Sequence, residues 1–393
     1  MMHIHQFICT FAAKITVMYD QIREDTLFIM LYGVVTATAV IACCYLLFRR
    51  ANAIAPDVTS SVRLRRWTGA FFASIALNHV WYMPIFFLSS SKDMLMNDLI
   101  GGLLDSMTFF PLAIIVLFAM LQDRRRPLWP VAVMMAPLVI VGIFTVVTRS
   151  YVPQSIVYAY CLLMSIGLII DMVREVRRYG HWLRDNYADL EHKEVWQSFV
   201  ILGIIMLVFV VYAFTDEGPI YQYTMQMIII VLICYLLWRV ETLSDLSAPI
   251  QSSTAMFNDA EKEKSLTEHV EDNDLSLSIR NDIGPLLKKY CEERQLYLQY
   301  DISISQLSQL IGINRSYISR HFASQGITYN SYINSLRIQH FVNLYHEAAA
   351  THQPITAQQL AYQSGFRNYN TFSAAFKRNM GMNATEWMLL AKS

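Results

Sequence analysis

The sequence predicts an all-α protein in which a seven-helix transmembrane bundle is followed by a smaller domain with two helix–turn–helix units. Composition is the first ground, because 54% of the 393 residues are hydrophobic and only 16% are charged, whereas a soluble domain has about 25% charged residues. The second ground is a pattern of helix, tight turn and capped helix that occurs twice near the C-terminus. The same composition excludes a disordered chain, a collagen and a small disulfide scaffold.

Seven apolar runs each approach the ~20 residues that a helix needs to cross a hydrocarbon core of about 30 Å. They span residues 27–48, 67–91, 99–122, 127–148, 150–170, 196–215 and 218–238. Helices are expected there because lipid offers exposed backbone groups no other partner. None of the runs shows the period-two alternation of a transmembrane strand.

Lysine and arginine are unevenly distributed between the loops, which predicts the orientation of the bundle. The loops after the first, third and fifth runs, together with Arg239, contain 14 of them, and the opposite side contains four. Since the positively charged side faces the cytoplasm, we expect segment 1–26 to be extracytoplasmic and the C-terminal domain to be cytoplasmic. The expected location is the cytoplasmic (inner) membrane of a bacterium. Met1 and Met18 are alternative starts of translation.

The formal net charge of zero is the sum of three unlike parts. Residues 1–250 contain 18 basic and 18 acidic side chains, residues 251–282 contain 3 and 8, and residues 283–393 contain 10 and 5. We therefore expect a transmembrane domain over 27–250, an acidic flexible linker over 251–282 and a basic domain over 283–393. The linker would repel both anionic lipid and nucleic acid.

The first helix–turn–helix unit of the basic domain begins with an apolar helical face over residues 304–311. Gly312 ends that helix, because a left-handed residue is favoured there. Asn314 is a good N-cap for the next helix, whose Ile318 and Phe322 face inward. The side chains left facing outward are Arg315, Ser316, Tyr317, Ser319 and Arg320.

The second unit repeats this layout about 50 residues further on. Thr356 caps its first helix, Gly365 makes the turn and Asn368 begins the second helix. Its outward polar side chains are Arg367, Asn368, Asn370, Thr371, Lys377 and Arg378. A long helix over residues 329–347 separates the two units. This arrangement predicts paired recognition helices in successive major grooves of double-stranded DNA, roughly 34 Å apart.

Residues 283–393 resemble the DNA-binding domain of AraC/XylS-type transcription regulators. The resemblance is carried by LSQLIGINRSYISRHF (307–322) and, more specifically, by GFRNYNTFSAAFKRNMG (365–381), and it covers a little over a quarter of the chain. It implies transcriptional regulation, with both recognition helices in contact with promoter DNA. The contacts implied by position are Ser316, Tyr317, Ser319 and Arg320 in the first helix and Arg367, Asn368, Asn370, Thr371 and Lys377 in the second.

The chain departs from the family pattern at three places. Ala323-Ser324 stands where the family often has a basic pair, Ala374 where it often has arginine, and Ala384 where it commonly has proline. Fewer phosphate contacts predict weaker and less salt-dependent DNA binding, since affinity falls with salt in proportion to the phosphates neutralised. Dimerisation on the membrane would offset this loss.

Asp105 is the one carboxylate well inside an apolar run. Ionisable groups inside a membrane are costly and are candidates for function. With Asn78 and His79 of the second run, Asp105 is a candidate for a sensing site that binds a ligand or an ion. The alternatives are a buried interhelical hydrogen bond and a position near the lipid headgroups.

The six cysteines show no CxxC pair and no metal-ligand spacing with histidine, so neither a disulfide nor a zinc site is predicted. No set of nucleophile and base and no metal motif is found along the chain. We therefore expect no cofactor and no enzymatic activity.

The leading hypothesis is a membrane-bound transcription regulator that acts as a homodimer. Its transmembrane domain would sense a small-molecule or membrane signal, and its C-terminal domain would bind DNA sequence-specifically. We expect the two domains to be coupled through residues 239–246, where the last span is extended. One alternative is a transporter or membrane enzyme whose state the DNA-binding domain reports, although the sequence shows no inverted repeat and no pair of Gly/Pro-broken helices. The other is a membrane domain that acts only as an anchor.

Overall fold

The computed structural model describes residues 24–148, 154–215, 219–246, 283–351 and 356–391. The expected linker lies outside these residues, and so does nearly all of the expected N-terminal segment. The chain divides into two compact units. Unit 1 comprises residues 1–177 and 192–248, and unit 2 comprises residues 178–191 and 249–393. This division differs from the sequence-based one in residues 178–191, which fall with the C-terminal domain.

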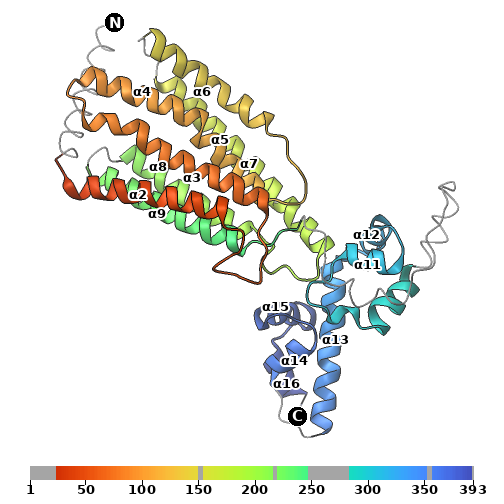
Figure 1. The fold of residues 1–393 in the computed structure, drawn as a ribbon. Coiled ribbons are helices and arrows are strands. Elements are labelled where there is room, and N and C mark those ends of the chain that lie inside the picture. The colour runs from red at the N-terminus through yellow and green to blue at the C-terminus, as the bar shows by residue number, and fades with distance from the viewer. Residues whose placement is uncertain (1–23, 149–153, 216–218, 247–282, 352–355, 392–393) are drawn as a thin grey trace, which may run out of the picture. The chain divides into compact units, whose positions relative to one another are not determined.

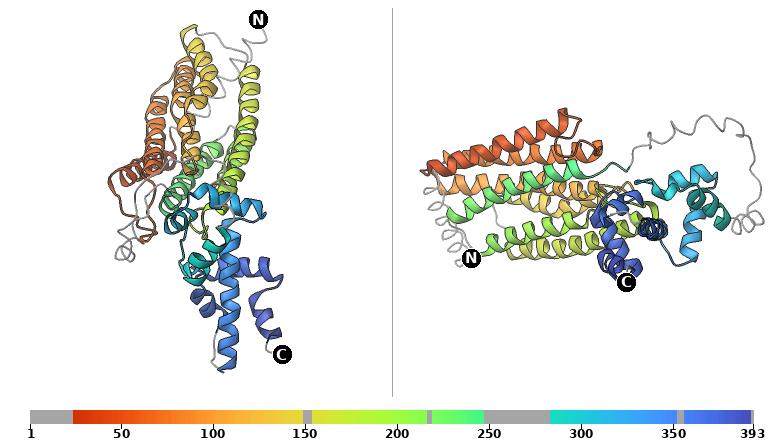
Figure 2. Two further views of the ribbon diagram at one scale, coloured as in Figure 1. Left: turned by 90° about the vertical axis from the view of Figure 1, so that its right-hand side faces the viewer. Right: turned by 90° about the horizontal axis from the view of Figure 1, so that it is seen from below.

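Unit 1 is a bundle of helices that lie side by side (Figures 1 and 2). Its elements are α2 (Thr26–Phe48), α3 (Val62–Tyr82), the 3₁₀ turn η1 (Met83–Phe86), α4 (Ser91–Met107), α5 (Phe109–Met120), α6 (Trp129–Thr148), most of α7 (Gln154–Asn186), α8 (Trp196–Thr215) and α9 (Pro219–Thr242). In the described part of the chain, every regular element is helical, with two isolated β-bridges besides. The all-α prediction is confirmed there.

Among the residues that the structure describes, four helical stretches are long and apolar enough to cross a membrane: Thr26–Phe48, Lys92–Met120 (α4 and α5 together), Trp129–Thr148 and Ile220–Thr242. The sequence predicted seven. The second predicted span lies in α3, whose first five residues include three arginines, and the fifth lies in α7, whose second half is charged. Several apolar side chains on these helices are highly exposed, such as Leu27 at 71%, Phe48 at 81% and Val147 at 75%. Such a surface is compatible with a lipid environment.

Prolines interrupt two of the predicted spans. Helix α3 ends at Tyr82, shortly before Pro84, and continues only as the turn η1. The third span breaks at Thr108, where α4 ends and α5 begins. Pro111 has no N–H that could donate to the carbonyl of Met107, the last residue of α4, so the hydrogen bonds of α4 are not continued there. The third span is therefore two helices.

Helix α3 is the most enclosed part of unit 1, since it contacts α2, α4, α5 and α9. Its buried side chains include Phe72 and the polar His79. A polar group in this position is costly unless it is hydrogen-bonded. The polar side chains of α3, such as His79, are therefore expected to have hydrogen-bond partners on the neighbouring helices.

Unit 2 is built around the long helix α13 (Tyr329–Ala350), which extends three residues beyond the predicted end. Its other elements are the π-helical turn η3 (Lys288–Glu293), the 3₁₀ turn η4 (Leu296–Leu298), α11 (Ile304–Ile311), α12 (Arg315–Ser324), α14 (Ala357–Gln363), α15 (Tyr369–Met380) and α16 (Ala384–Leu390). Figure 1 shows α11 and α12 near the beginning of α13, and α14–α16 along the rest of it. Each helix pair has its own apolar core.

Candidate DNA-binding interface

Local capping defines the first helix–turn–helix unit, α11–α12. Ser303 Oγ accepts from the Gln306 N–H at 3.3 Å, and Gln306 Oε1 accepts from the Ser303 N–H at 2.7 Å, which together form a capping box. Gly312 ends α11 with a φ of 77°. Asn314 Oδ1 then accepts from the Ser316 N–H at 3.0 Å at the start of α12. A cap of this kind contributes about 1 kcal/mol.

The second unit, α14–α15, has the same caps. Thr356 Oγ1 accepts from the Gln359 N–H at 3.2 Å, and Gln359 Oε1 accepts from the Thr356 N–H at 3.1 Å. Asn368 Oδ1 accepts from the Thr371 N–H at 2.7 Å at the start of α15. The repeat that the sequence predicted is therefore a repeat of local structure.

Buried apolar side chains fix which face of each second helix points outward. In α12, Ile318 and Phe322 are 0% and 3% exposed and belong to the first core. In α15, Phe372 and Phe376 are fully buried in the second core. Because one face of each helix is held inward, the opposite face is left for a partner.

The predicted contact residues occupy the outward faces and the turns that precede them. The exposed ones are Arg315, Ser316, Arg320, Asn370, Lys377 and Arg378, and the half-buried ones are Tyr317, Ser319, Arg367, Asn368 and Thr371. In the contacts described, three of these side chains form a hydrogen bond or an ion pair within the protein. Ser316 Oγ donates to Asn314 Oδ1 at 3.0 Å, Asn368 serves as the N-cap, and Arg367 forms an ion pair with Asp301 at 3.4 Å.

The charges of these helices favour an anionic partner. No Asp or Glu occurs in residues 302–346 or 348–385, which include both helix–turn–helix units. The Arg320 guanidinium lies 6.0 Å from the ring centre of Tyr317, near the outer limit for a cation–π contact. Burial lowers the pKa of the neighbouring His321, so this side chain is neutral at pH 7. Arginine and lysine are thus the charged groups of the interface.

Arg337 of α13, which the sequence analysis missed, joins the two halves of unit 2. The residue is 1% exposed, and its guanidinium donates to the carbonyl oxygens of Tyr297, Gln299 and Tyr300 at 2.7, 2.8 and 3.1 Å. It also lies 5.5 Å from the ring centre of Phe366, in the second unit. Burial lowers the pKa of Arg337, and nearby acidic groups, first among them Asp189, oppose this shift.

The turn of the second unit lies directly against the segment that precedes the first. Gly365 has a φ of 85°, and a Cβ atom placed there would lie 2.7 Å from Leu298 Cα. Any other residue would therefore strain the backbone and clash with it. Together with Arg337, this contact fixes the relative position of the two recognition helices.

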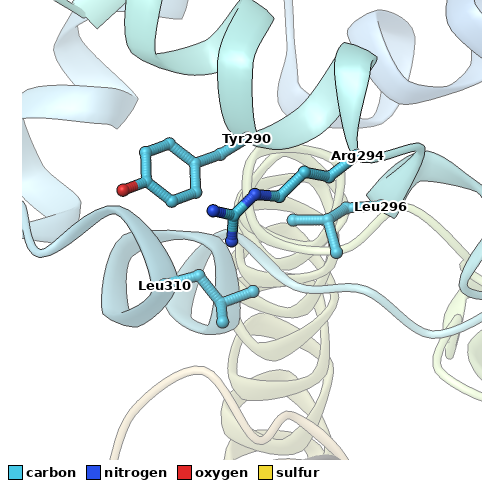
Figure 3. Close-up of a pocket in the computed structure, with 4 residues that line it drawn as sticks. All are labelled: Tyr290, Arg294, Leu296 and Leu310. Atoms are coloured by element: carbon cyan, nitrogen blue, oxygen red, sulfur yellow. The ribbon is translucent and has the colours of Figure 1, made fainter. Parts of the chain in front are cut away.

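A cavity of about 400 Å³ lies elsewhere on unit 2, between η3, η4 and α11. Figure 3 shows the Arg294 side chain extending between Tyr290 and Leu310, with Leu296 beside it. The guanidinium carbon lies 4.7 Å from the centre of the Tyr290 ring. Since α12 and α15 contribute no wall of this cavity, it is separate from the predicted contact residues.

In unit 1, two of the three predicted sensing residues interact. Asn78 Nδ2 donates to Asp105 Oδ1 at 2.8 Å and Oδ2 at 3.0 Å, and Tyr82 Oη donates to Oδ2 at 3.2 Å. His79 lies within hydrogen-bonding distance of Gln226 Oε1, at 2.9 Å, and its carbonyl accepts from Tyr32 at 2.5 Å. Adjacent helical residues point about 100° apart, which explains why His79 and Asn78 have different partners.

Cysteines and metal-ligand residues form no site in the described residues. The cysteines described there, at positions 43, 44, 161, 234 and 291, are free. Within the same residues, no group of three His, Cys, Asp or Glu side chains is placed to hold a metal ion.

Comparison with known proteins is informative for the C-terminal region. Residues 307–389 match the family model for a helix-turn-helix domain. An uncharacterised HTH-type transcriptional regulator of Staphylococcus aureus (strain MRSA252) is 31% identical over 101 residues, which are 25% of this chain and 13% of that protein. The TCP pilus virulence regulatory protein of Vibrio cholerae is 30% identical over 77 residues, which are 20% of this chain and 26% of that protein.

The chain therefore spans about an eighth of the length of the staphylococcal relative and a quarter of the Vibrio one. No solved structure matches the chain significantly. The match confirms the predicted resemblance for residues 307–389, which contain the capped repeat and the acid-free helices, and it points to a role of this region in transcriptional regulation. The C-terminal region of the chain is an AraC-type helix–turn–helix domain.

Proposed function

We propose that the protein is a membrane-bound transcription regulator whose two recognition helices bind double-stranded promoter DNA sequence-specifically. The observation that carries this proposal is the duplicated, capped and acid-free helix–turn–helix pair, held in one arrangement by Arg337. The contacts proposed in the first unit are Arg315, Ser316, Tyr317, Ser319 and Arg320. Those in the second unit are Arg367, Asn368, Asn370, Thr371, Lys377 and Arg378.

The proposed location is the bacterial inner membrane, with seven spans and the DNA-binding domain in the cytoplasm. The exposed apolar side chains of α2 and α6 support contact with a lipid bilayer. The excess of arginine and lysine in one set of loops supports the orientation. A homodimer is proposed because two copies on one membrane would offset the small number of phosphate contacts per copy.

Signal sensing is proposed for the Asn78–Asp105 pair of unit 1, with His79 on the adjacent face of α3. The support is the Asp105 carboxylate, which Asn78 of α3 binds within a largely apolar bundle. An ionisable group inside a membrane is costly and is a candidate for function. The signal would be a small molecule or a membrane component. A ligand would act by differing in affinity for two arrangements of the bundle.

The DNA-binding proposal is tested by the double substitution Arg320→Ala with Lys377→Ala in the full chain. Each unit then loses one exposed cation, and chromosomal occupancy is expected to fall at least tenfold, since phosphate contacts provide much of the affinity. The matched control is Lys288→Ala with Lys289→Ala, which removes the same charge from exposed positions of η3. Equal occupancy in the two double variants would overturn the proposal.

A second candidate function is transport, with the DNA-binding domain reporting on its activity. The observation that favours it is the break at Thr108, since a broken helix beside an intramembrane carboxylate is a feature of transporter binding sites. The sequence-based argument against transport did not include this break. Uptake by proteoliposomes that contain the purified chain would support transport, whereas signal-dependent DNA binding without uptake would support sensing.

A further inference from the structure

The last residues of α7 and the loop after it, residues 178–191, belong to the same compact unit as the DNA-binding domain. The contact is made by backbone hydrogen bonds. Tyr187 forms an isolated antiparallel bridge with Ser303, and the Ala188 N–H donates to the Ile302 carbonyl at 3.2 Å. Ser303 is the N-cap of α11, so this bridge ends where the first helix–turn–helix unit begins.

Asn330, the second residue of α13, completes the contact. Its side-chain amide donates to the carbonyl oxygens of Ala188 at 2.6 Å and Tyr187 at 3.3 Å. Tyr187 and Ala188 follow the last residue of α7, so their carbonyls lie outside the hydrogen-bond pattern of that helix, and leaving such groups buried and unpaired is unfavourable. Asn334 in turn donates to Asn330 Oδ1 at 3.1 Å, which orients the amide.

Side-chain burial extends the same contact into the first core. Ala188 is fully buried and belongs to the cluster that contains Ile318 and Phe322 of α12. Asp189 is 3% exposed and interacts electrostatically with Arg337. One short segment therefore contacts the start of α11, the start of α13 and the arginine that joins the two recognition helices.

On its other side, α7 is held within unit 1. Glu175 accepts from Arg124 at 2.9 and 3.0 Å and from Arg126 at 2.7 and 2.9 Å, and the Glu175 and Arg126 side chains are each 7% exposed. Both arginines lie in the loop between α5 and α6. Glu175 lies about three helical turns before Asn186, the last residue of α7, and Tyr187 follows directly.

We propose that residues 178–191 are a structural part of the DNA-binding domain and that α7 transmits signals from the membrane bundle to the recognition helices. The contact of residues 178–191 with the DNA-binding domain is independent of the proposed function, whereas the transmission of a signal by α7 rests on that function. A rotation or shift of α7 would move the backbone to which Ser303 and Asn330 are bonded, which alters the starts of α11 and α13. The acidic linker then serves as a covalent tether and not as the coupling route.

Disulfide trapping tests the docking. Facing residues of an antiparallel pair have Cβ atoms about 4.5–5.5 Å apart, close to the range that a disulfide bridges. Tyr187→Cys and Ser303→Cys are combined in the full chain, with a protease site in the linker, and membranes are oxidised and cleaved. We expect the fragments to remain joined on a non-reducing gel and to separate on reduction.

The matched control combines Tyr187→Cys with Thr351→Cys, an exposed position roughly 30 Å along α13 from Asn330. Each single-cysteine variant controls for disulfides with native cysteines. A Tyr187–Ser303 pair that crosslinks no better than the control pair would overturn the docking.

Insertions test the coupling route. One, two and four alanines are inserted between Arg177 and Arg178, and the same lengths are inserted within residues 251–282. Each residue turns the following helix by about 100° and moves it by 1.5 Å. We expect one or two alanines in α7 to change chromosomal occupancy at least fivefold and four to restore part of it, because four residues are close to one turn. The linker insertions should leave occupancy within twofold.

Equal effects of the two insertion series would overturn the coupling by α7. Failure of the proposed function has a different signature, because an unmodified chain that occupies no specific chromosomal sites would refute DNA regulation itself. The crosslinking result would still decide whether residues 178–191 dock onto the DNA-binding domain.

Discussion

The ends of α7 and α9 are alike in sequence and different in structure. Both follow apolar runs and carry arginine where the charge pattern predicts the cytoplasmic side. The end of α7 is bonded to residues of the helix–turn–helix domain. The contacts described for the end of α9 lie within unit 1: the Ser244 N–H donates to the His192 carbonyl at 2.9 Å, and the Asp245 N–H donates to the Thr59 carbonyl at 2.7 Å.

Glu241 is the centre of the α9 contacts. Its side chain is 1% exposed and accepts from the N–H groups of Ala53 and Ile54, at 3.1 and 2.8 Å, and from the Tyr45 hydroxyl. Gln122 bonds to both Ser244 and Leu246 at 2.9 Å. The sequence analysis expected coupling at residues 239–246, but the structure holds this segment within the bundle. Although α9 is the helix that the chain follows toward the DNA-binding domain, it need not be the helix that transmits movement to that domain.

Loss of the α9 contacts gives the largest expected effect. Glu241→Ala leaves the Ala53 and Ile54 N–H groups without their acceptor, and the expected cost is about 2–4 kcal/mol in unit 1. Hydrogen exchange of the full chain in nanodiscs should show lost protection in residues 49–62 and unchanged protection in α11–α13. Glu24→Ala, at an exposed position, is the control. Loss of protection in α11–α13 as well would contradict the separation of the two helix ends.

The α7 contacts should give a smaller effect in the other unit. Asn330→Ala removes the two hydrogen bonds to Tyr187 and Ala188, and the expected cost is about 1–3 kcal/mol. Protection should fall at residues 187–189 and 302–303 and stay unchanged in residues 49–62. Ser331→Ala, on the exposed side of α13, should change neither. Unaltered exchange at residues 187–189 in Asn330→Ala would show that the amide does not hold α7.

The Glu175 ion pairs predict a dependence on acid. Burial by itself would raise the pKa of Glu175, but hydrogen bonds and charge from Arg126 and Arg124 lower it below the usual 4.5. The stabilisation is therefore complete above that usual value and is lost as the pH falls through the lowered pKa. Thermal unfolding measured between pH 7 and pH 3 should show this loss in the natural chain and less of it in Glu175→Gln. Identical pH profiles would refute the ion pairs.

The smallest expected effect is that of His321 in unit 2. Because burial lowers its pKa, the unfolded chain binds a proton more readily than the folded one, so stability should fall as the pH drops below the usual 6.5. His321→Gln should flatten this part of the pH profile of unit 2. The measurement is hydrogen exchange of α12, corrected for its intrinsic pH dependence. A profile as steep as that of the natural chain would exclude His321 as the source.

The helix–turn–helix domain was predictable because its signals are local. The Ser303–Gln306 and Thr356–Gln359 capping boxes, Gly312 and Asn314 each act within a few residues of their own position. Most of the predicted contact residues are exposed for the same reason, since an apolar stripe such as Ile318 and Phe322 fixes the opposite face. The engagement of Arg367 by Asp301 was not visible, because the two are 66 residues apart.

The sequence by itself determined the helical class, the apolar runs and the two capped units, because periodicity and caps depend on neighbours within one or two turns. The tertiary structure decided which distant groups meet: His79 with Gln226, Arg337 with three carbonyls, and α7 with Asn330. No spacing in the chain encodes these pairs, since each depends on how whole helices pack. The sequence analysis therefore assigned the end of α7 to the predicted transmembrane domain, although the carbonyls of Tyr187 and Ala188 just after it accept hydrogen bonds from Asn330.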